Sequence, residues 1–309
     1  PAIALHALFL LITIGIVALG VERGIEAATK LMVPSIVVLM IALAVWAFTL
    51  GGAGAGYTYF LSPDFGAILD NAGTSIPFAV SQAFFTLSLG MGIMITYSSY
   101  IGEDDNLTID GSIIVVVNTL IGVLAGLVVF PILFAQGIDP NTEAAAAVFI
   151  AVASAFGQLP AGQILGVIFF AVVLIAALSS AISLTEVVVS YANDNYGISR
   201  PKLAGGIGLG IFVLGLPSAW DTAWLTWFDN IAYQLLLPLS VLLVAIFVGW
   251  VIGRDALDEL EQGTDGLPTF GPIWLWAVRI VVVVGVLFTL ALGIETLFLA
   301  DDPAIVPPV

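Results

Sequence analysis

Long apolar runs separated by short polar breaks dominate the sequence. Runs of roughly 20 residues are long enough, as helices, to cross about 30 Å of hydrocarbon. They predict eight membrane-spanning helices, at 2–20, 31–51, 76–100, 108–136, 160–191, 203–218, 223–252 and 271–298. The pattern therefore predicts an all-α polytopic membrane protein, with one membrane domain over residues 1–309.

Composition supports this class and excludes several functions. The chain is 61% hydrophobic and only 9% charged, whereas about a quarter of the residues of an average globular protein are charged. With 22 acidic and 6 basic residues, it lacks the clustered cations that nucleic-acid binding needs. It has no cysteine and a single histidine, His6, and no nucleotide-binding or hydrolase motif, so we expect no enzyme activity. The acidic excess indicates either loops adapted to high salt, as in a salt-adapted prokaryote, or ordinary solvated loops.

The few cations predict the orientation in the cell membrane. With eight alternating crossings they fall on or near one side, which the positive-inside rule makes cytoplasmic. They are Arg23, Lys30, Arg200, Lys202, Arg254 and Arg279. Both ends of the chain then lie outside. Because the sequence opens with Pro1 inside a span, we expect earlier segments to be missing.

The third predicted span carries a polar interruption. Thr86 and Ser88 lie just before Gly90 and Gly92, near mid-depth. Irregular backbone at this depth is tolerated only where protein or a water-filled cavity covers it. One interpretation is an unwound ion and substrate site, since hydroxyls and free carbonyls can bind a hard cation. The alternative is close helix packing through small residues.

Polar residues in other spans allow similar pairs of interpretations. Asn118 could bind an ion or bond a neighbouring helix, and Ser179 and Ser180 could offer oxygens to an ion or bond back to their own helix. Glu186, near the cytoplasmic end of the fifth span, is an ionisable group in a costly position. Asp229, near the outer end of the seventh span, could be a gate charge or complement the helix dipole.

Several segments together resemble the neurotransmitter:sodium symporter family, especially its prokaryotic amino-acid transporters. The segment 82–92, Gln-Ala-Phe-Phe-Thr-Leu-Ser-Leu-Gly-Met-Gly, is similar to the family's unwound sixth helix and continues into Thr-Tyr-Ser-Ser-Tyr at 96–100. Asn118 and the stretch from Ala176 to Ser180 match the family's next two helices. The resemblance implies that the spans correspond to family helices four to eleven, with a broken helix near Gly90–Gly92 and the second inverted repeat at about 76–252. Helices one to three would come from the full-length chain or a companion chain.

The resemblance also implies the roles of individual residues. Thr86 and Asn118 would ligate a first sodium, and Ala176, Ser179 and Ser180 a second. The substrate pocket would be lined by Phe85, Thr86, Ser88, Met91, Ser180 and Leu184, with Phe85 as its lid. Asp229 would belong to the outer gate, and Asp194, Tyr100 and Ser99 to the inner gate, with Glu186 nearby.

The expected function is sodium-coupled symport of an amino acid or similar small amine by alternating access. Two sodium ions are expected as cofactors, whereas Gly122 stands at the position that distinguishes chloride-dependent relatives and leaves chloride open. Two alternatives remain: a non-transporting membrane fragment or subunit, and a proton-coupled amino-acid permease. The sequence does not name the substrate, and Met91 makes the expected pocket adaptable.

Overall fold

The computed structural model describes residues 2–102, 105–138, 140, 152–158, 161–261, 271–299 and 303–308, and these residues form helices without any strand. The chain divides into two compact units. Unit one contains Pro1–Ala18, Gly66–Val115 and Ser183–Val309, and unit two contains Leu19–Phe65 and Val116–Ile182. Two long helices, α7 (Leu107–Ala135) and α10 (Gly162–Tyr196), run from one unit into the other along the sequence.

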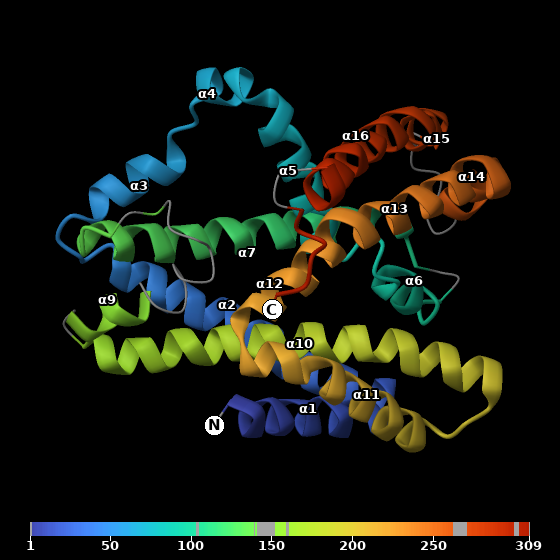
Figure 1. Ribbon diagram of the computed structural model, residues 1–309, viewed down its shortest axis with the longest axis horizontal. Coiled ribbons are helices and arrows are strands. Elements are labelled where there is room, and N and C mark those ends of the chain that lie inside the picture. Colours follow the sequence, from blue (N-terminus) through green and yellow to red (C-terminus); the bar gives the residue numbers. More distant parts are fainter. Residues whose placement is uncertain are drawn as a thin grey trace. The chain divides into compact units, whose positions relative to one another are not determined.

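Unit one holds most of the helices (Figure 1). Its remaining elements are α1 (Ala2–Ala18), α4 (Phe65–Asp70), α5 (Ala72–Thr86), α6 (Ile93–Ser98), α11 (Arg200–Trp220), α12 (Thr222–Ile231), η3 (Ala232–Leu236), α13 (Leu237–Ile246), η4 (Phe247–Ile252), α14 (Asp255–Glu261), α15 (Gly271–Ala277), η5 (Val278–Val282), α16 (Val283–Ile294) and η6 (Glu295–Leu299). Unit two adds η1 (Val21–Glu26), α2 (Ala27–Ala47), α3 (Ala53–Leu61) and α9 (Val152–Gln158). The η elements are π-helical turns.

The eight predicted spans correspond to three kinds of segment. Six are continuous helices long and apolar enough to cross a membrane: Val21–Ala47, Leu107–Ala135, Gly162–Tyr196, Arg200–Trp220, Thr222–Ile252 and Gly271–Leu299. One is the shorter apolar helix α1. The third predicted span, 76–100, is interrupted between α5 and α6, as expected. The described chain is thus an all-helical polytopic membrane protein.

The predicted boundaries of the second span are wrong. We expected 31–51, but the helical segment runs from Val21 to Ala47. Its charged start, which we interpreted as a loop, is helical and carries an exposed ion pair between Glu26 and Lys30 at 2.6 Å, one turn apart. Pro34 lies inside the helix without ending it.

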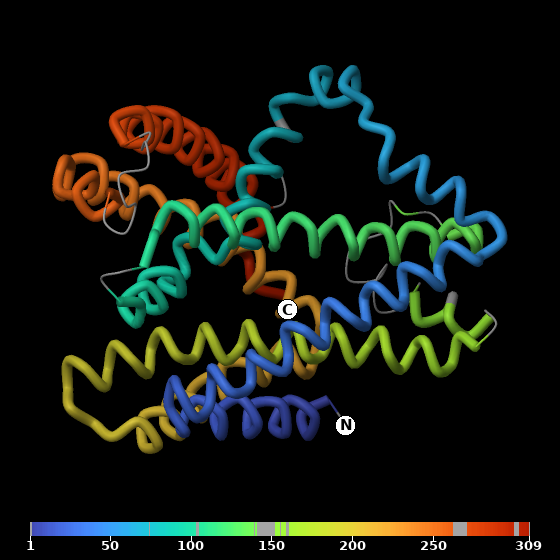
Figure 2. Tube along the Cα trace, turned by 180° about the vertical axis from the view of Figure 1, so that it is seen from behind, coloured from blue at the N-terminus to red at the C-terminus, as the bar shows by residue number. Residues whose placement is uncertain are grey.

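Close packing in unit one explains two glycines of the sixth span, Gly208 and Gly215. Helix α1 lies alongside α11 in both views (Figures 1 and 2). A Cβ at Gly208 would lie 2.0 Å from a side-chain carbon of Ile14, and one at Gly215 would lie 2.7 Å from His6 Nε2. Glycine therefore allows the two helices to approach closely, as in other membrane helix pairs.

Each unit has its own apolar core. In unit one, Phe84 packs with Leu237, Val241, Leu242 and Val286, which joins α5 to α13 and α16. This core lies directly beside the interruption after α5. In unit two, residues of α2, α7, α9 and α10 form a separate core that includes Leu43, Ile132 and Phe169.

Candidate substrate and gating site

The interruption between α5 and α6 is built on three left-handed residues. Ser88, Gly90 and Gly92 have φ angles of 57°, 79° and 79°. Glycine adopts such angles without steric cost, whereas Ser88 pays of order 1–2 kcal/mol for them. The backbone N–H of Leu89 donates to the Phe84 carbonyl at 2.8 Å, which closes the end of α5. The predicted break in the helix is therefore confirmed, and Ser88 lies within it.

Neighbouring helices fit tightly against the interruption. A Cβ at Gly90 would lie 2.8 Å from Val241 Cγ2 and 2.9 Å from the Leu237 carbonyl oxygen. A Cβ at Gly92 would lie 2.9 Å from Val187 Cγ1 on α10. Glycine is thus required here both for its backbone angle and for its size.

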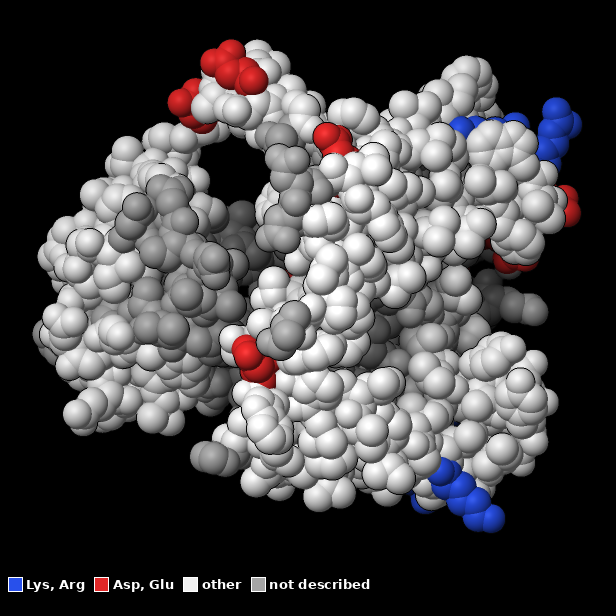
Figure 3. Space-filling view, in the orientation of Figure 1, with Lys and Arg blue, Asp and Glu red and all other residues white. Residues whose placement is uncertain are grey.

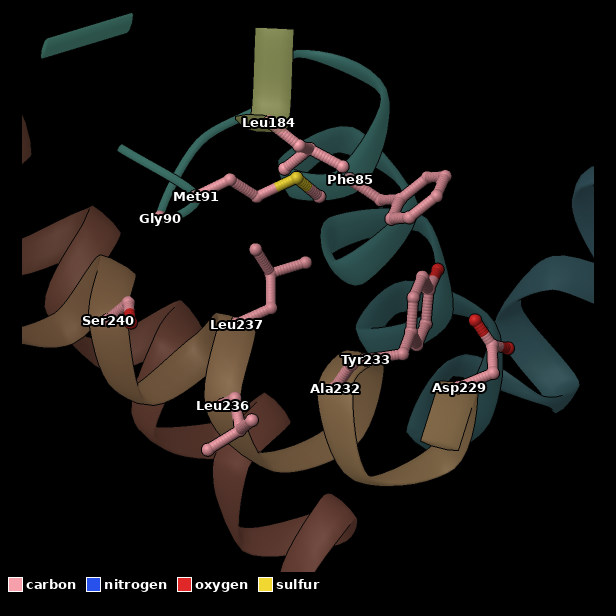
Figure 4. A pocket seen from close by; sticks show the side chains of 10 residues that line it. All are labelled: Phe85, Gly90, Met91, Leu184, Asp229, Ala232, Tyr233, Leu236, Leu237 and Ser240. Atoms are coloured by element: carbon pink, nitrogen blue, oxygen red, sulfur yellow. The ribbon is translucent and has the colours of Figure 1, made fainter. Parts of the chain in front are cut away.

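A cavity of about 360 Å³ opens beside this interruption, within unit one. Phe85, Met91 and Leu184 lie on one side, and Asp229, Tyr233 and Leu237 face them from the other (Figure 4). The described residues that line it are Phe85, Gly90, Met91, Leu184, Asp229, Ala232, Tyr233, Leu236, Leu237 and Ser240. The size and the mostly apolar wall with a few polar groups are typical of small-molecule sites.

Tyr233 connects the two sides of this cavity. Its ring centroid lies 5.9 Å from that of Phe85, with the rings tilted by 54°, a favourable aromatic arrangement. Its hydroxyl donates to Gln82 Oε1 at 3.3 Å. Asp229 lies one helical turn before Tyr233 and is the only charged side chain among the lining residues that the structure describes.

The cavity brings together some of the residues that were predicted to line the substrate pocket and to form the outer gate. Phe85, Met91 and Leu184 of the predicted pocket line it, and so does the predicted gate residue Asp229. Ser88 instead lines a second cavity, which shares Gly90 with the first. Thr86 lines neither of these two cavities, and Ser180 belongs to unit two.

Sequence reasoning missed the wall supplied by α12, η3 and α13. A signal was present: positions 229, 233, 236, 237 and 240 recur at helical spacing along one face. We singled out only the charge at the start of this stripe. The helical period alone does not say which face of this helix lines a cavity, so Tyr233, Leu237 and Ser240 were not identified.

The predicted sodium ligands divide between the units. In unit two, the hydroxyls of Ser179 and Ser180 donate to the Ala176 carbonyl at 2.8 and 3.3 Å, so the three residues of the second set share one patch of α10. Of the first set, Thr86 belongs to unit one and Asn118 to unit two. Both ion assignments stay predictions.

A polar network near the end of α10 contains one of the three predicted inner-gate residues, Tyr100, together with Glu186, which was expected nearby. The Tyr100 hydroxyl donates to Glu186 Oε1 at 2.7 Å and lies 2.9 Å from Ser190 Oγ. Arg200, at the start of α11, forms an ion pair with Glu186, whose side chain is fully buried. Nearby, the Tyr97 hydroxyl hydrogen-bonds Ser183 Oγ at 2.8 Å.

The other two predicted gate residues lie at the margin of this network. Ser190 Oγ is 3.5 Å from Asp194 Oδ2, which is a long contact. The Ser99 hydroxyl donates to the Thr96 carbonyl of its own helix at 2.7 Å. The sequence did not single out Arg200 as a partner of Glu186, because we interpreted it only as an orienting cation.

A comparison of the whole sequence with protein-family models decides the class of this arrangement. The model of the sodium:neurotransmitter symporter family matches residues 3–301. The chain belongs to the sodium:neurotransmitter symporter family. Its members are transporters, so the expectation that the chain is no enzyme agrees with this membership.

Individual members of the family show how much of the protein this chain represents. It is 34% identical to the uncharacterized sodium-dependent transporter YhdH of Bacillus subtilis over 292 residues, which is 91% of this chain and 64% of that protein. A sodium-dependent transporter of Haemophilus influenzae is 35% identical over 89% of this chain and 62% of its own length. The chain thus spans somewhat less than two thirds of these relatives.

The family fold is also recognised in a solved structure. The crystal structure of MhsT in complex with L-phenylalanine superposes with a TM-score of 0.80 and 37% sequence identity, over 93% of this chain and 66% of MhsT. The helical fold of this chain is therefore similar to that of MhsT.

Proposed function

We propose that this chain is the larger part of a sodium-coupled symporter of an amino acid or a similar small amine. The observation that carries the proposal is the interruption at Ser88–Gly92 with a small-molecule cavity against it. Irregular backbone inside a span is costly unless it serves a covered site. In transporters with discontinuous helices, substrates and ions bind at such breaks near the midplane.

The cavity suits a substrate with an amine and an apolar side chain. Asp229 supplies a negative charge for an ammonium group, and Met91, Leu184 and Leu237 supply an apolar wall. Phe85, whose ring packs against that of Tyr233, is the proposed lid of the substrate pocket. MhsT, with L-phenylalanine in its crystal structure, supports an amino-acid substrate for the whole protein.

Sodium is the proposed driving ion. The Ala176 carbonyl and the hydroxyls of Ser179 and Ser180 are neutral oxygen donors within one turn of α10, and hard cations prefer oxygen ligands. We assign these three residues to one sodium, and Thr86 with Asn118 to another on the family resemblance. Binding of the ions would shift the population between outward-open and inward-open states.

The network of Tyr100, Glu186 and Arg200 is the proposed inner gate. It joins the segment after α6 to α10 and α11 through one buried carboxylate. A buried charge that loses its partner without gaining water is strongly destabilised. Opening this side therefore requires a concerted rearrangement, whereas Asp229 at the first cavity serves the outer gate.

The test is uptake by the full-length protein in proteoliposomes. Labelled L-phenylalanine, followed by a panel of the other amino acids and small amines, is offered with an inward sodium gradient or with potassium in its place. We expect accumulation only with sodium. Leu184→Trp, which fills the cavity, should reduce uptake at least tenfold, and Val188→Trp, one turn further on α10 at an exposed position, should not.

Three outcomes would overturn the proposal. Equal uptake in potassium, abolished instead by collapsing a proton gradient, indicates the proton-coupled permease. No uptake of any offered substrate by correctly folded full-length protein indicates the non-transporting subunit. Equal loss in the two tryptophan variants would remove the cavity from the transport path.

A further inference from the structure

Tyr233 contacts one face of α5 at three places within unit one. Its ring centroid lies 5.9 Å from that of Phe85 and 6.5 Å from that of Phe78, and the rings are tilted in both pairs. Its hydroxyl donates to Gln82 Oε1 at 3.3 Å. These three positions on α5 follow one another at about one helical turn, so they share a face of the helix. A single side chain of η3 therefore contacts α5 from Phe78 to the proposed lid, Phe85.

The turn that carries Tyr233 is supported from behind. Tyr233 lies in the π-helical turn η3, and such turns inside α-helices are frequent at functional sites. A Cβ at Gly293 of α16 would lie 2.1 Å from the Gln234 carbonyl oxygen, so the two backbones are in direct contact. From this support, the Tyr233 side chain points toward Phe85 (Figure 4). The turn η3 is therefore a fixed base on which the tyrosine can hold another helix.

The helix on the other side of this contact ends at the interruption. Helix α5 ends at Thr86 and is not continuous with α6. Hinge motions are absorbed by a few residues at the ends of such elements. Phe85 precedes Ser88 by three residues and is 48% exposed, and its ring packs against that of Tyr233. A movement of α5 about the interruption would therefore make or break the contact with Tyr233.

The groups that join η3 to α5 are neutral. Most described residues on the face shown in Figure 3 are likewise uncharged. A phenol bonded to an amide avoids the desolvation penalty of an ion pair, and its hydrogen bond contributes less than one to a charged group. The contact made by Tyr233 is therefore suited to breaking and forming again in each transport cycle, in contrast to the buried pair of Glu186 with Arg200.

We propose that Tyr233 is the positioning residue of the outer lid. Its ring holds the Phe85 ring at the substrate pocket, and its hydroxyl fixes the preceding turn of α5 through Gln82. This inference rests on the proposed function, in which Phe85 is the lid. Tyr233 thereby slows the escape of a bound substrate to the outside, whereas Asp229 supplies the charge of the same wall.

The distance between α5 and α12 tests the contact without any transport assay. The chain contains no cysteine, so the full-length protein, with any cysteine in its remaining segments replaced, can be spin-labelled at Ile76→Cys and Leu225→Cys, both exposed positions. Double electron–electron resonance then gives the populations of shorter and longer distances. In Tyr233→Leu, the population of the shorter distance should fall by at least about half, as expected for the loss of an aromatic pair. Phe247→Leu, which changes an aromatic residue of another π-helical turn in the same span, should leave it unchanged.

Release of bound substrate gives the functional measurement. The full-length protein is loaded in sodium with labelled L-phenylalanine, or with the amino acid that the uptake panel selects, and release is followed after an excess of unlabelled substrate is added. Tyr233→Leu should release it about tenfold faster, and Tyr233→Phe, which keeps the ring, about two- to threefold faster. Gln82→Leu should match Tyr233→Phe, and the two changes together should do little more, because both remove the same hydrogen bond. A merely structural role would lower the melting temperature without this order of release rates.

The outcomes separate this inference from the proposed function. If the unaltered protein binds no substrate, the proposed function fails and the role of the lid fails with it. If it binds substrate with sodium, but release and distances in Tyr233→Leu equal those in Phe247→Leu, only the role of Tyr233 is overturned. Should Tyr233→Leu fail to fold, Tyr233→Phe and Gln82→Leu decide the question, and release at the unaltered rate in both would overturn the inference.

Discussion

In the first part of α10, the hydroxyls of Ser179 and Ser180 turn back to the Ala176 carbonyl of their own helix. In the second part, Ser183, Glu186 and Ser190 contact side chains from other elements. Ser180 is exposed and Ser179 half-buried, whereas Glu186 is fully buried. One helix thus carries two polar patches of opposite character.

The difference indicates two different tasks. A hydroxyl that donates its hydrogen to a carbonyl keeps its lone pairs available to a cation, so the first patch is suited to a ligand that arrives and leaves. In the second patch, a buried carboxylate already has a cationic and a hydroxyl partner, so this patch is suited to holding helices together. Substitutions in the first patch should change the dependence of transport on ions, and substitutions in the second patch should change the stability of the fold.

The strongest test of the second patch is Glu186→Gln. It leaves the Arg200 guanidinium without its charge partner, and breaking a buried pair costs about 3–5 kcal/mol. Because the Arg200 side chain is 23% exposed, we expect the lower end of this range. Thermal unfolding followed by tryptophan fluorescence of the full-length protein should show a clear fall in melting temperature.

An exposed ion pair provides the matched control for Glu186. Glu26 and Lys30 are also paired, but with 48% and 74% of their side chains exposed, and such pairs contribute little. Glu26→Gln should leave the melting temperature nearly unchanged. In addition, Glu186→Gln combined with Arg200→Gln should recover part of the loss. If Glu186→Gln and Glu26→Gln have the same melting temperature, the second patch does not stabilise the fold.

A smaller but still large effect is expected where the second patch meets the interruption. In Gly92→Ala, the new methyl group would lie 2.9 Å from Val187 Cγ1, at a residue with φ of 79°. Strained backbone of this kind costs of order 1–3 kcal/mol. The same melting measurement should detect it.

The control for Gly92 is a glycine with free space around it. A Cβ at Gly205 on α11 meets nothing within 4 Å, and alanine is the better helix former by roughly 0.5–1 kcal/mol. Gly205→Ala should therefore leave stability unchanged or raise it. A similar loss at both positions would mean that the conformation of the interruption is not what Gly92 provides.

These residues also indicate which features of the fold and the site could be predicted from the sequence. The break was predictable because Ser88, Gly90 and Gly92 stand together at mid-span, where hydrocarbon penalises free backbone. The pairing of Glu186 with Arg200 was not, because it depends on how the chain turns between α10 and α11, through Gly197 at φ of 63°. Hydropathy misplaced the start of the second span because it assigns charged residues to loops, whereas Arg23, Glu26 and Lys30 lie in the helical segment Val21–Ala47. Tyr233 and Ser240 were hidden within an apolar span, where periodicity alone does not say which face meets a cavity.

The first patch is tested by Ser179→Ala. If the hydroxyl is an ion ligand, its removal should raise the sodium concentration for half-maximal uptake by the full-length protein about tenfold, which corresponds to roughly 1.4 kcal/mol. The melting temperature in sodium-free buffer should hardly change. Both measurements are needed, because removal of a purely structural hydroxyl would lower the melting temperature without changing the sodium dependence of uptake.

Ser112→Ala is the control for Ser179. The Ser112 hydroxyl donates to the Thr108 carbonyl of its own helix at 2.7 Å, so its local bonding resembles that of Ser179 without any proposed ion. Its sodium dependence should match the unaltered protein. An equal shift in both variants would show that the Ser179 hydroxyl acts only on its helix.

The smallest expected effect comes from the edge of the second patch. Tyr97→Phe removes the 2.8 Å hydrogen bond to Ser183, a bond between neutral groups whose net contribution is about 0.5–1.5 kcal/mol. Tyr100→Phe removes a bond to the Glu186 carboxylate, and bonds to charged groups contribute more, about 1.5–3 kcal/mol. Thermal unfolding of the two variants, measured side by side, should therefore show a smaller fall in melting temperature for Tyr97→Phe than for Tyr100→Phe. The reverse order would place the stabilising centre of the patch at Ser183 instead of Glu186, and the contrast between the two parts of α10 would then begin one turn earlier.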